Sequence, residues 1–230
     1  MFSTIVSAIK KFSLFVVAFF VAAISALAVI SAVHTRPVAA ASNVAAPASD
    51  HYNRHLVDTA VSLLRSGYIV LRTGAGADSY LLAQMNRKDK TYSHCGIVMV
   101  EHGYPFVYHS IGGEDNPDER LRRDSASFFF SPLHNEGLAV VRYDYDSEKI
   151  SDLRQVVTAY YKARPKFDMK FDLKTDDKLY CAEFVYKAVN KATHDPTYIQ
   201  TTSVLGCTFV GIDNLFVNAH AHIIWKTKFK

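Results

Sequence analysis

Cysteine is scarce in this sequence, and its three cysteines are widely separated. Cys95, Cys181 and Cys207 form no CxxC pair, which excludes a disulfide framework and a zinc site built from paired cysteines. One disulfide between Cys95 and Cys207, which would leave Cys181 as a free thiol, is the most that this number allows in an oxidising compartment.

Excess charge of one sign is also scarce. Of the net charge of +4, three units come from Lys10, Lys11 and Arg36, in a first segment without acidic residues, so the chain after about residue 42 carries only +1. A nearly neutral domain offers no basic stripe to nucleic acid, and we expect no nucleic-acid partner. The pair Gly74 and Gly76 is not followed by the Lys-Ser or Lys-Thr of a phosphate loop, and we expect no cofactor.

One long hydrophobic run is present near the start of the chain. Residues 12–33 carry no charge and are long enough to cross a bilayer as a helix, and the positive charges before them predict a cytoplasmic N-terminus. We therefore expect a membrane anchor over residues 1–33, with a cleaved secretory signal as the alternative. Residues 34–52 are expected to form a linker, and residues 53–230 a domain outside the cytoplasm, on the periplasmic or extracellular face, or secreted if cleavage occurs.

Hydrophobic periodicity after the linker predicts an α+β domain. Helices are expected over residues 53–66, 79–85 and 151–163, with another beginning near Cys181. Strands are expected over residues 68–72, 91–100, 105–110 and 137–143, with short segments at 207–210 and 222–225. Residues 112–132 resemble a charged loop that carries an apolar plug, Phe128–Phe130.

Two histidines occur on neighbouring strands that form a predicted hairpin. If the turn is Glu101-His102, His94 faces His109 across the ladder; if it is His102-Gly103, His109 faces Gly96, one step along the same face as His94. In both registers the two imidazoles share a face, and only a three-residue loop would place them on opposite faces. Such a pair supplies a general base and a residue that orients it.

The third reactive residue, Cys181, begins the most amphipathic segment of the chain. An apolar stripe runs along this predicted helix, whereas Glu183 and Lys187 are expected on its outer side, and Thr175–Asp177 offers an N-cap. A thiol in the first turn of a helix meets unpaired N–H groups and the positive end of the macrodipole, which lower its pKa. The alternative is a small buried hydrophobic residue.

Together these residues match the roles of a cysteine hydrolase. Cys181 is expected to be the nucleophile, His94 the general base and His109 the orienting group, with Glu114 as a rival for the last role. The N–H groups at the helix start would form the oxyanion hole. Two alternatives remain: a zinc site made of His94, His109 and Cys181, and an inactive module that uses the same pocket to bind ligands.

Several stretches, taken in order, resemble a known family. Ser66–Gly74, the SHCGIV stretch from Ser93, the VYHS stretch from Val107, and the YCAEFVY stretch from Tyr180 are similar to the circularly permuted NlpC-type papain-like cysteine hydrolases, in the YiiX/YebB-like branch. The similarity covers residues 54–220, roughly. Tyr68 stands where relatives often have an acidic residue.

The resemblance implies a permuted papain-like fold in which an antiparallel half-barrel sheet packs on the nucleophile helix. It implies Cys181 as nucleophile, His94 as general base and acid, and His109, where relatives often have Glu, as orienting residue. The implied activity is hydrolysis or acyl transfer at an amide, ester or thioester bond through an acyl-enzyme on Cys181. The implied substrates are cell-envelope peptides or lipid acyl groups, reached from the membrane to which residues 1–33 attach the domain.

Overall fold

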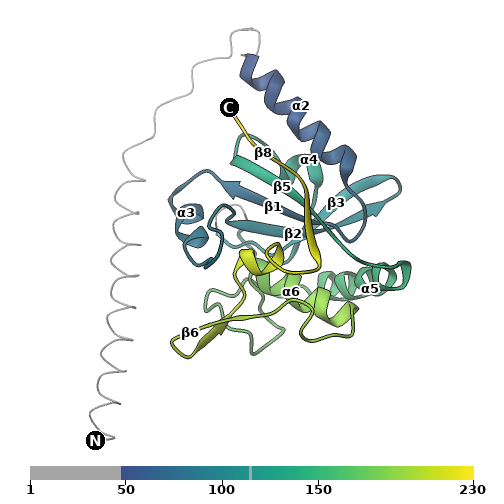
Figure 1. Cartoon of the computed structure of the whole chain (residues 1–230), viewed down its shortest axis with the longest axis vertical. Helices are drawn as coiled ribbons and strands as arrows, with labels where there is room; N and C mark the ends of the chain where they lie inside the picture. Colours follow the sequence, from purple (N-terminus) through teal and green to yellow (C-terminus); the bar gives the residue numbers. More distant parts are fainter. Residues whose placement is uncertain (1–47, 114–115) are drawn as a thin grey trace, which may run out of the picture. The chain divides into compact units, whose positions relative to one another are not determined.

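The computed structural model describes residues 48–113 and 116–230 (Figure 1). The expected anchor or signal segment, residues 1–33, and residues 34–47 of the expected linker lie outside these residues. Within the described part, no helix combines the length and the hydropathy that a membrane crossing requires.

The described chain is an α+β fold built on one antiparallel sheet. Its strands are β1 (Ile69–Gly74), β2 (His94–Glu101), β3 (Tyr104–His109), β4 (Arg122–Ser125), β5 (Asn135–Tyr143) and β8 (Ala221–Lys228). Their order is β4-β3-β2-β1-β5-β8, so β2 and β1 lie at the centre and β4 and β8 at the edges. A separate small hairpin pairs β6 (Thr202–Val204) with β7 (Cys207–Phe209).

Helices cover both faces of the sheet (Figure 1). The helices are α2 (Ala48–Leu63), α3 (Ala77–Ala83), α4 (Ala126–Phe129), α5 (Ser147–Ala163), α6 (Cys181–Ala192) and the 3₁₀ helix η1 (Ile212–Leu215). α2 and α4 pack on one face, and α5 and α6 on the other. We call these the α4 face and the α6 face.

Strand β2 shows how the sequence produces this double-sided core. Cys95, Ile97 and Met99 belong to the hydrophobic cluster on the α6 face, whereas Val98 belongs to the cluster on the α4 face. Successive side chains of a strand point to opposite faces, so a strand covered on both sides is a continuous apolar run. This run predicted the strand correctly.

The region expected to be a charged loop, residues 112–132, contains two regular elements, and that prediction was wrong in part. β4 pairs with β3 along the sheet edge, and Ser125 then accepts a hydrogen bond from the N–H of Phe128 to cap α4. The plug was placed correctly for Phe129 and Phe130, which are buried, but Phe128 is exposed. β4 lacks apolar alternation because an edge strand that faces solvent does not require it.

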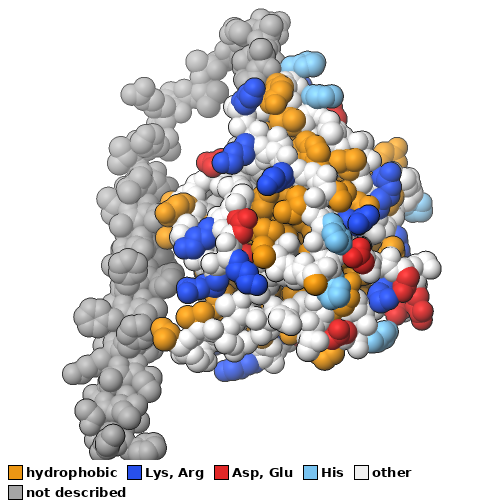
Figure 2. All heavy atoms as spheres, in the orientation of Figure 1, with side chains coloured by type: hydrophobic (Ala, Val, Ile, Leu, Met, Phe, Trp, Pro, Cys, Tyr) orange, Lys and Arg blue, Asp and Glu red, His pale blue; other side chains and the backbone are white. Residues whose placement is uncertain are grey.

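Other boundaries differ by a few residues. α2 begins at Ala48, five residues before the expected start and inside the expected linker, and α5 begins at Ser147, four residues earlier than expected, with its N-cap at Asp146. The second edge strand, β8, is longer than the short segment predicted there. Exposed hydrophobic side chains include Tyr52 on α2 and Ile223 and Ile224 on the edge strand β8. Figure 2 shows hydrophobic side chains at the surface among charged ones.

Candidate functional site

The β2–β3 hairpin brings His94 and His109 together. His102 and Gly103 form its turn with φ angles of 51° and 86°, and Ile97 pairs with Tyr108, which is the second of the two expected registers. A turn with positive φ at both central residues suits the twist of a tight hairpin, and glycine favours it. Both imidazoles lie on the α4 face, and the Nε2 atom of His94 is 2.9 Å from the Nδ1 atom of His109.

Gly96 makes this approach of the two imidazoles possible. A Cβ atom at position 96 would lie 2.9 Å from the carbonyl oxygen of Tyr108 and 3.1 Å from the Cβ atom of His109. Any side chain here would push β3 away, because backbone atoms cannot move aside cheaply. The glycine in the SHCGIV stretch therefore has a structural reason.

Asp124 extends the pair into a chain of three polar residues, and sequence reasoning missed it. The Nε2 atom of His109 lies 2.9 Å from Oδ2 of Asp124, whose Oδ1 accepts a hydrogen bond of 2.9 Å from Nη2 of Arg122. Asp124 comes from β4, where no pattern had predicted a strand. The rival orienting residue, Glu114, lies outside the described residues.

The hydrogen bonds assign a tautomer to each ring. Burial opposes ionisation of Asp124, but the hydrogen bonds from His109 and Arg122 lower its pKa, so this group is a carboxylate that only accepts. His109 must then donate from Nε2, which leaves its Nδ1 as the acceptor for the Nε2–H group of His94. The remaining nitrogen of His94, Nδ1, carries a lone pair and is the one able to take a proton.

Both imidazoles are neutral at neutral pH. Burial lowers the pKa of His94 well below its usual value, and the positive charge of Arg72 and the neighbouring His109 ring act in the same direction. Burial also lowers the pKa of His109, against the opposing effect of Asp124. The ring of Phe129 packs against both imidazoles, with centroids 5.7 Å and 5.1 Å away, and excludes water from them.

Cys181 is the first residue of α6, on the α6 face. The predicted apolar stripe is confirmed: Ala182, Phe184, Val185, Ala188 and Val189 are all buried. The predicted N-cap was wrong, because the N-cap is Tyr180. The Glu183 side chain accepts a hydrogen bond of 3.2 Å from the backbone N–H group of Tyr180. This bond to the side chain of the third helical residue satisfies a backbone donor that would otherwise be free.

Glu183 was expected on the outer side of the helix, and this prediction was also wrong. Its side chain is fully buried, and burial raises its pKa to about 7. Oε1 lies 3.0 Å from Nζ of Lys187, without the alignment of a hydrogen bond, and the same ammonium group lies 2.7 Å from Asp176. The i,i+4 spacing identified the ion pair between Glu183 and Lys187 correctly, but it does not reveal that the Glu183 carboxylate is buried.

The Cys181 thiol contacts Cys95 on β2. The hydrogen bond from the Cys95 thiol lowers the pKa of Cys181, and the N–H group of Ala182 acts in the same direction, whereas burial opposes both. Burial and the same contact raise the pKa of Cys95 well above its usual value. All three cysteines are free thiols, and Cys207 is exposed while Cys95 is buried, so the bridge between them that the count allowed is not formed.

The spatial relation between Cys181 and His94 is indirect in this structure. Cys95, which the thiol contacts, follows His94 directly in β2, and the two neighbours point to opposite faces of the strand. Within residues 48–113 and 116–230, the hydrogen bond of the His94 side chain leads to His109, and none joins it to Cys181. Cys181 and His94 are each 8% exposed.

The zinc alternative finds no geometric support in the part of the chain described. No three His, Cys, Asp or Glu side chains there are grouped closely enough to hold a metal ion. His94 and His109 bond to each other instead, and the partner of Cys181 is a second thiol.

Comparison with known proteins shows the fold. No protein-family model matches the chain, and no curated protein matches it by sequence. Among solved structures, the fold is similar to the crystal structure of metalloprotein YiiX from Escherichia coli O157:H7, described as DUF1105, with a TM-score of 0.59 and 18% sequence identity over 71% of this chain and 98% of that chain. The chain therefore has a YiiX-like α+β fold.

Proposed function

We propose that this chain is a cysteine hydrolase or acyltransferase with a permuted papain-like fold and Cys181 as its nucleophile. The observation that carries the proposal is the position of the Cys181 thiol, at the first residue of α6, where a thiol and a backbone N–H group lower its pKa despite burial. Low thiol pKa at a helix start is a property of reactive cysteines rather than of structural ones.

The polar chain on β2, β3 and β4 supplies the general base. The Nδ1 atom of His94 would take the proton of the Cys181 thiol, and His109 and Asp124 hold His94 in the required tautomer. Because His94 and Cys95 point to opposite faces of β2, the thiol–imidazole hydrogen bond would form only around the end of the strand, where His94 is the first residue, when substrate binds and both side chains turn toward each other. Such bonds are often long in enzymes without substrate.

The proposed reaction has two steps. The thiolate attacks the carbonyl carbon of an amide, ester or thioester, and the N–H groups at the start of α6 stabilise the oxyanion. As the bond to the leaving group breaks, His94 returns its proton to that group, and a thioester on Cys181 results. Water, or an acceptor in a transferase, then attacks the thioester with His94 again as base.

Covalent labelling tests the proposal. The full chain is treated with an activated-ester probe and its intact mass is measured; we expect one adduct, lost in Cys181→Ala and retained in Cys207→Ser, whose thiol is exposed and serves as the control. Labelling should survive a metal chelator. An adduct that persists in Cys181→Ala, or one that the chelator abolishes, would refute the thiol mechanism.

We also propose that residues 1–33 attach the domain to a membrane with the domain outside the cytoplasm, so that its substrates are envelope peptides or lipid acyl groups. Removal of residues 1–42 should release a soluble protein that retains labelling at Cys181. An insoluble product would show that the removed segment is part of the folded domain.

A further inference from the structure

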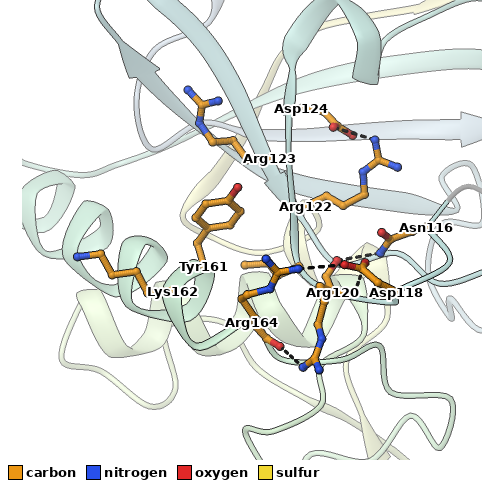
Figure 3. A pocket seen from close by; sticks show the side chains of 10 residues that line it. Asn116, Asp118, Arg120, Arg122, Arg123, Asp124, Tyr161, Lys162 and Arg164 are labelled. Carbon is orange, nitrogen blue, oxygen red and sulfur yellow. Dashed lines mark hydrogen bonds and ion pairs between the residues drawn. The ribbon is translucent and has the colours of Figure 1, made fainter.

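A cavity of about 440 Å³ lies where the edge strand β4 meets the C-terminal end of α5 (Figure 3). Its lining residues are mostly charged: Asn116, Asp118, Arg120, Leu121, Arg122, Arg123, Asp124, Tyr161, Lys162 and Arg164. Five of these side chains are cationic and two are carboxylates. The ten lining residues taken together with Glu101, which pairs with Arg123, carry two positive charges more than negative ones.

The chain is nearly neutral after its first segment, so this concentration of positive charge is local. From this cavity we infer a binding site for a phosphate group carried by a small molecule or a lipid headgroup. The planar guanidinium group presents paired N–H donors that match two phosphate oxygens, which makes arginine the preferred residue for such recognition. A volume of 440 Å³ is within the usual range for ligand sites and leaves room for the group that carries the phosphate.

Arg120 and Arg164 are held in position with donors to spare. Nη1 of Arg120 donates to the carbonyl oxygen of Arg164 at 2.6 Å, and Nη2 of Arg164 lies 3.0 Å from Asp118 (Figure 3). Within the described chain each of these two side chains makes one hydrogen bond, although a guanidinium group has five N–H groups. An incoming phosphate can therefore bind without displacing the existing partners.

The ion pair between Arg164 and Asp118 does not compete strongly with a ligand. Both side chains are more than half exposed, at 63% and 58%, and exposed pairs of this kind contribute little to stability. A phosphate dianion, with more charge and more acceptor atoms than one carboxylate, gains more from the same guanidinium group.

The cavity borders the polar chain of the candidate catalytic site. Asp124 lines the cavity and also bonds to His109, and Arg122 contacts the same carboxylate. A phosphate bound here would lie beside Asp124, the last residue of the hydrogen-bonded series His94, His109 and Asp124. The site thus suits a recognition group of a larger ligand, although its existence does not depend on catalysis by Cys181.

Calorimetric titration of the full chain in a neutral detergent tests the site. The probes are inorganic phosphate, glycerol 3-phosphate, and phosphatidic acid in mixed micelles. Detergent without added lipid and succinate serve as blanks. We expect saturable binding of at least one phosphate monoester. Binding of glycerol 3-phosphate identifies a soluble source, and binding of phosphatidic acid alone identifies a lipid headgroup.

Arg120→Gln with Arg164→Gln should weaken this binding by at least about tenfold, because each substitution removes charge-assisted hydrogen bonds. Arg164→Gln alone, at an exposed side chain, should weaken it measurably and guards against misfolding of the double variant. Arg54→Gln is the matched control, since Arg54 is equally exposed and also paired with a carboxylate. No binding by any phosphate probe, equal binding by the arginine variants, or equal binding of succinate would overturn the inference, whatever the result of labelling at Cys181.

Discussion

His109 Nε2 and Asp124 Oδ2 lie 2.9 Å apart, so the edge strand β4 supplies the residue that ends the polar chain from His94. This contact determines which nitrogen of His109 carries hydrogen, and through it which nitrogen of His94 is free to accept a proton. The geometry of three strands therefore sets the chemistry of one atom, Nδ1 of His94.

Replacing His94 tests that atom. His94→Ala should lower the rate of Cys181 acylation by at least about a hundredfold, the usual scale for loss of a general base. The matched control is His222→Ala, because His222 also bonds to an aspartate, Asp144, at 2.8 Å but lies on the exposed strand β8. Acylation rates that are equal in the two variants would remove His94 from the mechanism.

Asp124 is expected to act as a positioning residue. Asp124→Asn removes the charge that orients His109, and we expect the acylation rate to fall by at least about tenfold, because His109 and, through it, His94 are no longer held in one tautomer. The pH dependence of the rate should also change, because the tautomer of His94 is no longer fixed. Asp144→Asn, which alters the exposed pair with His222, should leave both the rate and its pH dependence unchanged.

The contact between the two thiols makes a separate prediction. Cys95→Val removes the hydrogen bond that lowers the pKa of Cys181, so alkylation of Cys181 by iodoacetamide should shift to higher pH. Cys95→Ser keeps a hydrogen-bond donor, so it should shift the pH dependence of Cys181 alkylation less than Cys95→Val does. Mass spectrometry of the alkylated peptide measures both, and a titration that is identical in wild type and Cys95→Val would show that the contact has no influence.

Glu183 should make stability depend on pH. Burial raises its pKa from the ordinary value of 4.5 to about 7, so between these values the folded chain holds a proton that the unfolded chain has lost. Stability from this group is therefore full below about pH 4.5 and decreases as pH rises toward 7.

Denaturant unfolding of wild type and Glu183→Gln at pH 5 and pH 7.5 isolates this effect, since glutamine does not titrate. Measured relative to Glu183→Gln, the free energy of unfolding of wild type should be lower at pH 7.5 than at pH 5. A difference that does not change with pH would show that Lys187 compensates fully for burial of the carboxylate.

The sequence predicted those parts of the site that depend on local pattern. Hairpin spacing placed His94 and His109 on one face, and helical period placed Cys181 at the start of an apolar helix. Asp124 could not be found in the same way, because the short polar strand β4 forms only by pairing with β3. Burial of Glu183 was equally hidden, since its spacing from Lys187 is the same as that of a surface ion pair.

The close packing of β3 against Gly96 has a consequence for how this chain can vary. A single added methyl group at that position would separate two strands by contact with backbone atoms, and the change would reach the proton-accepting nitrogen of His94 without altering any polar side chain. Loss of activity in a Gly96 variant that still folds would thus be a fault of spacing rather than of chemistry.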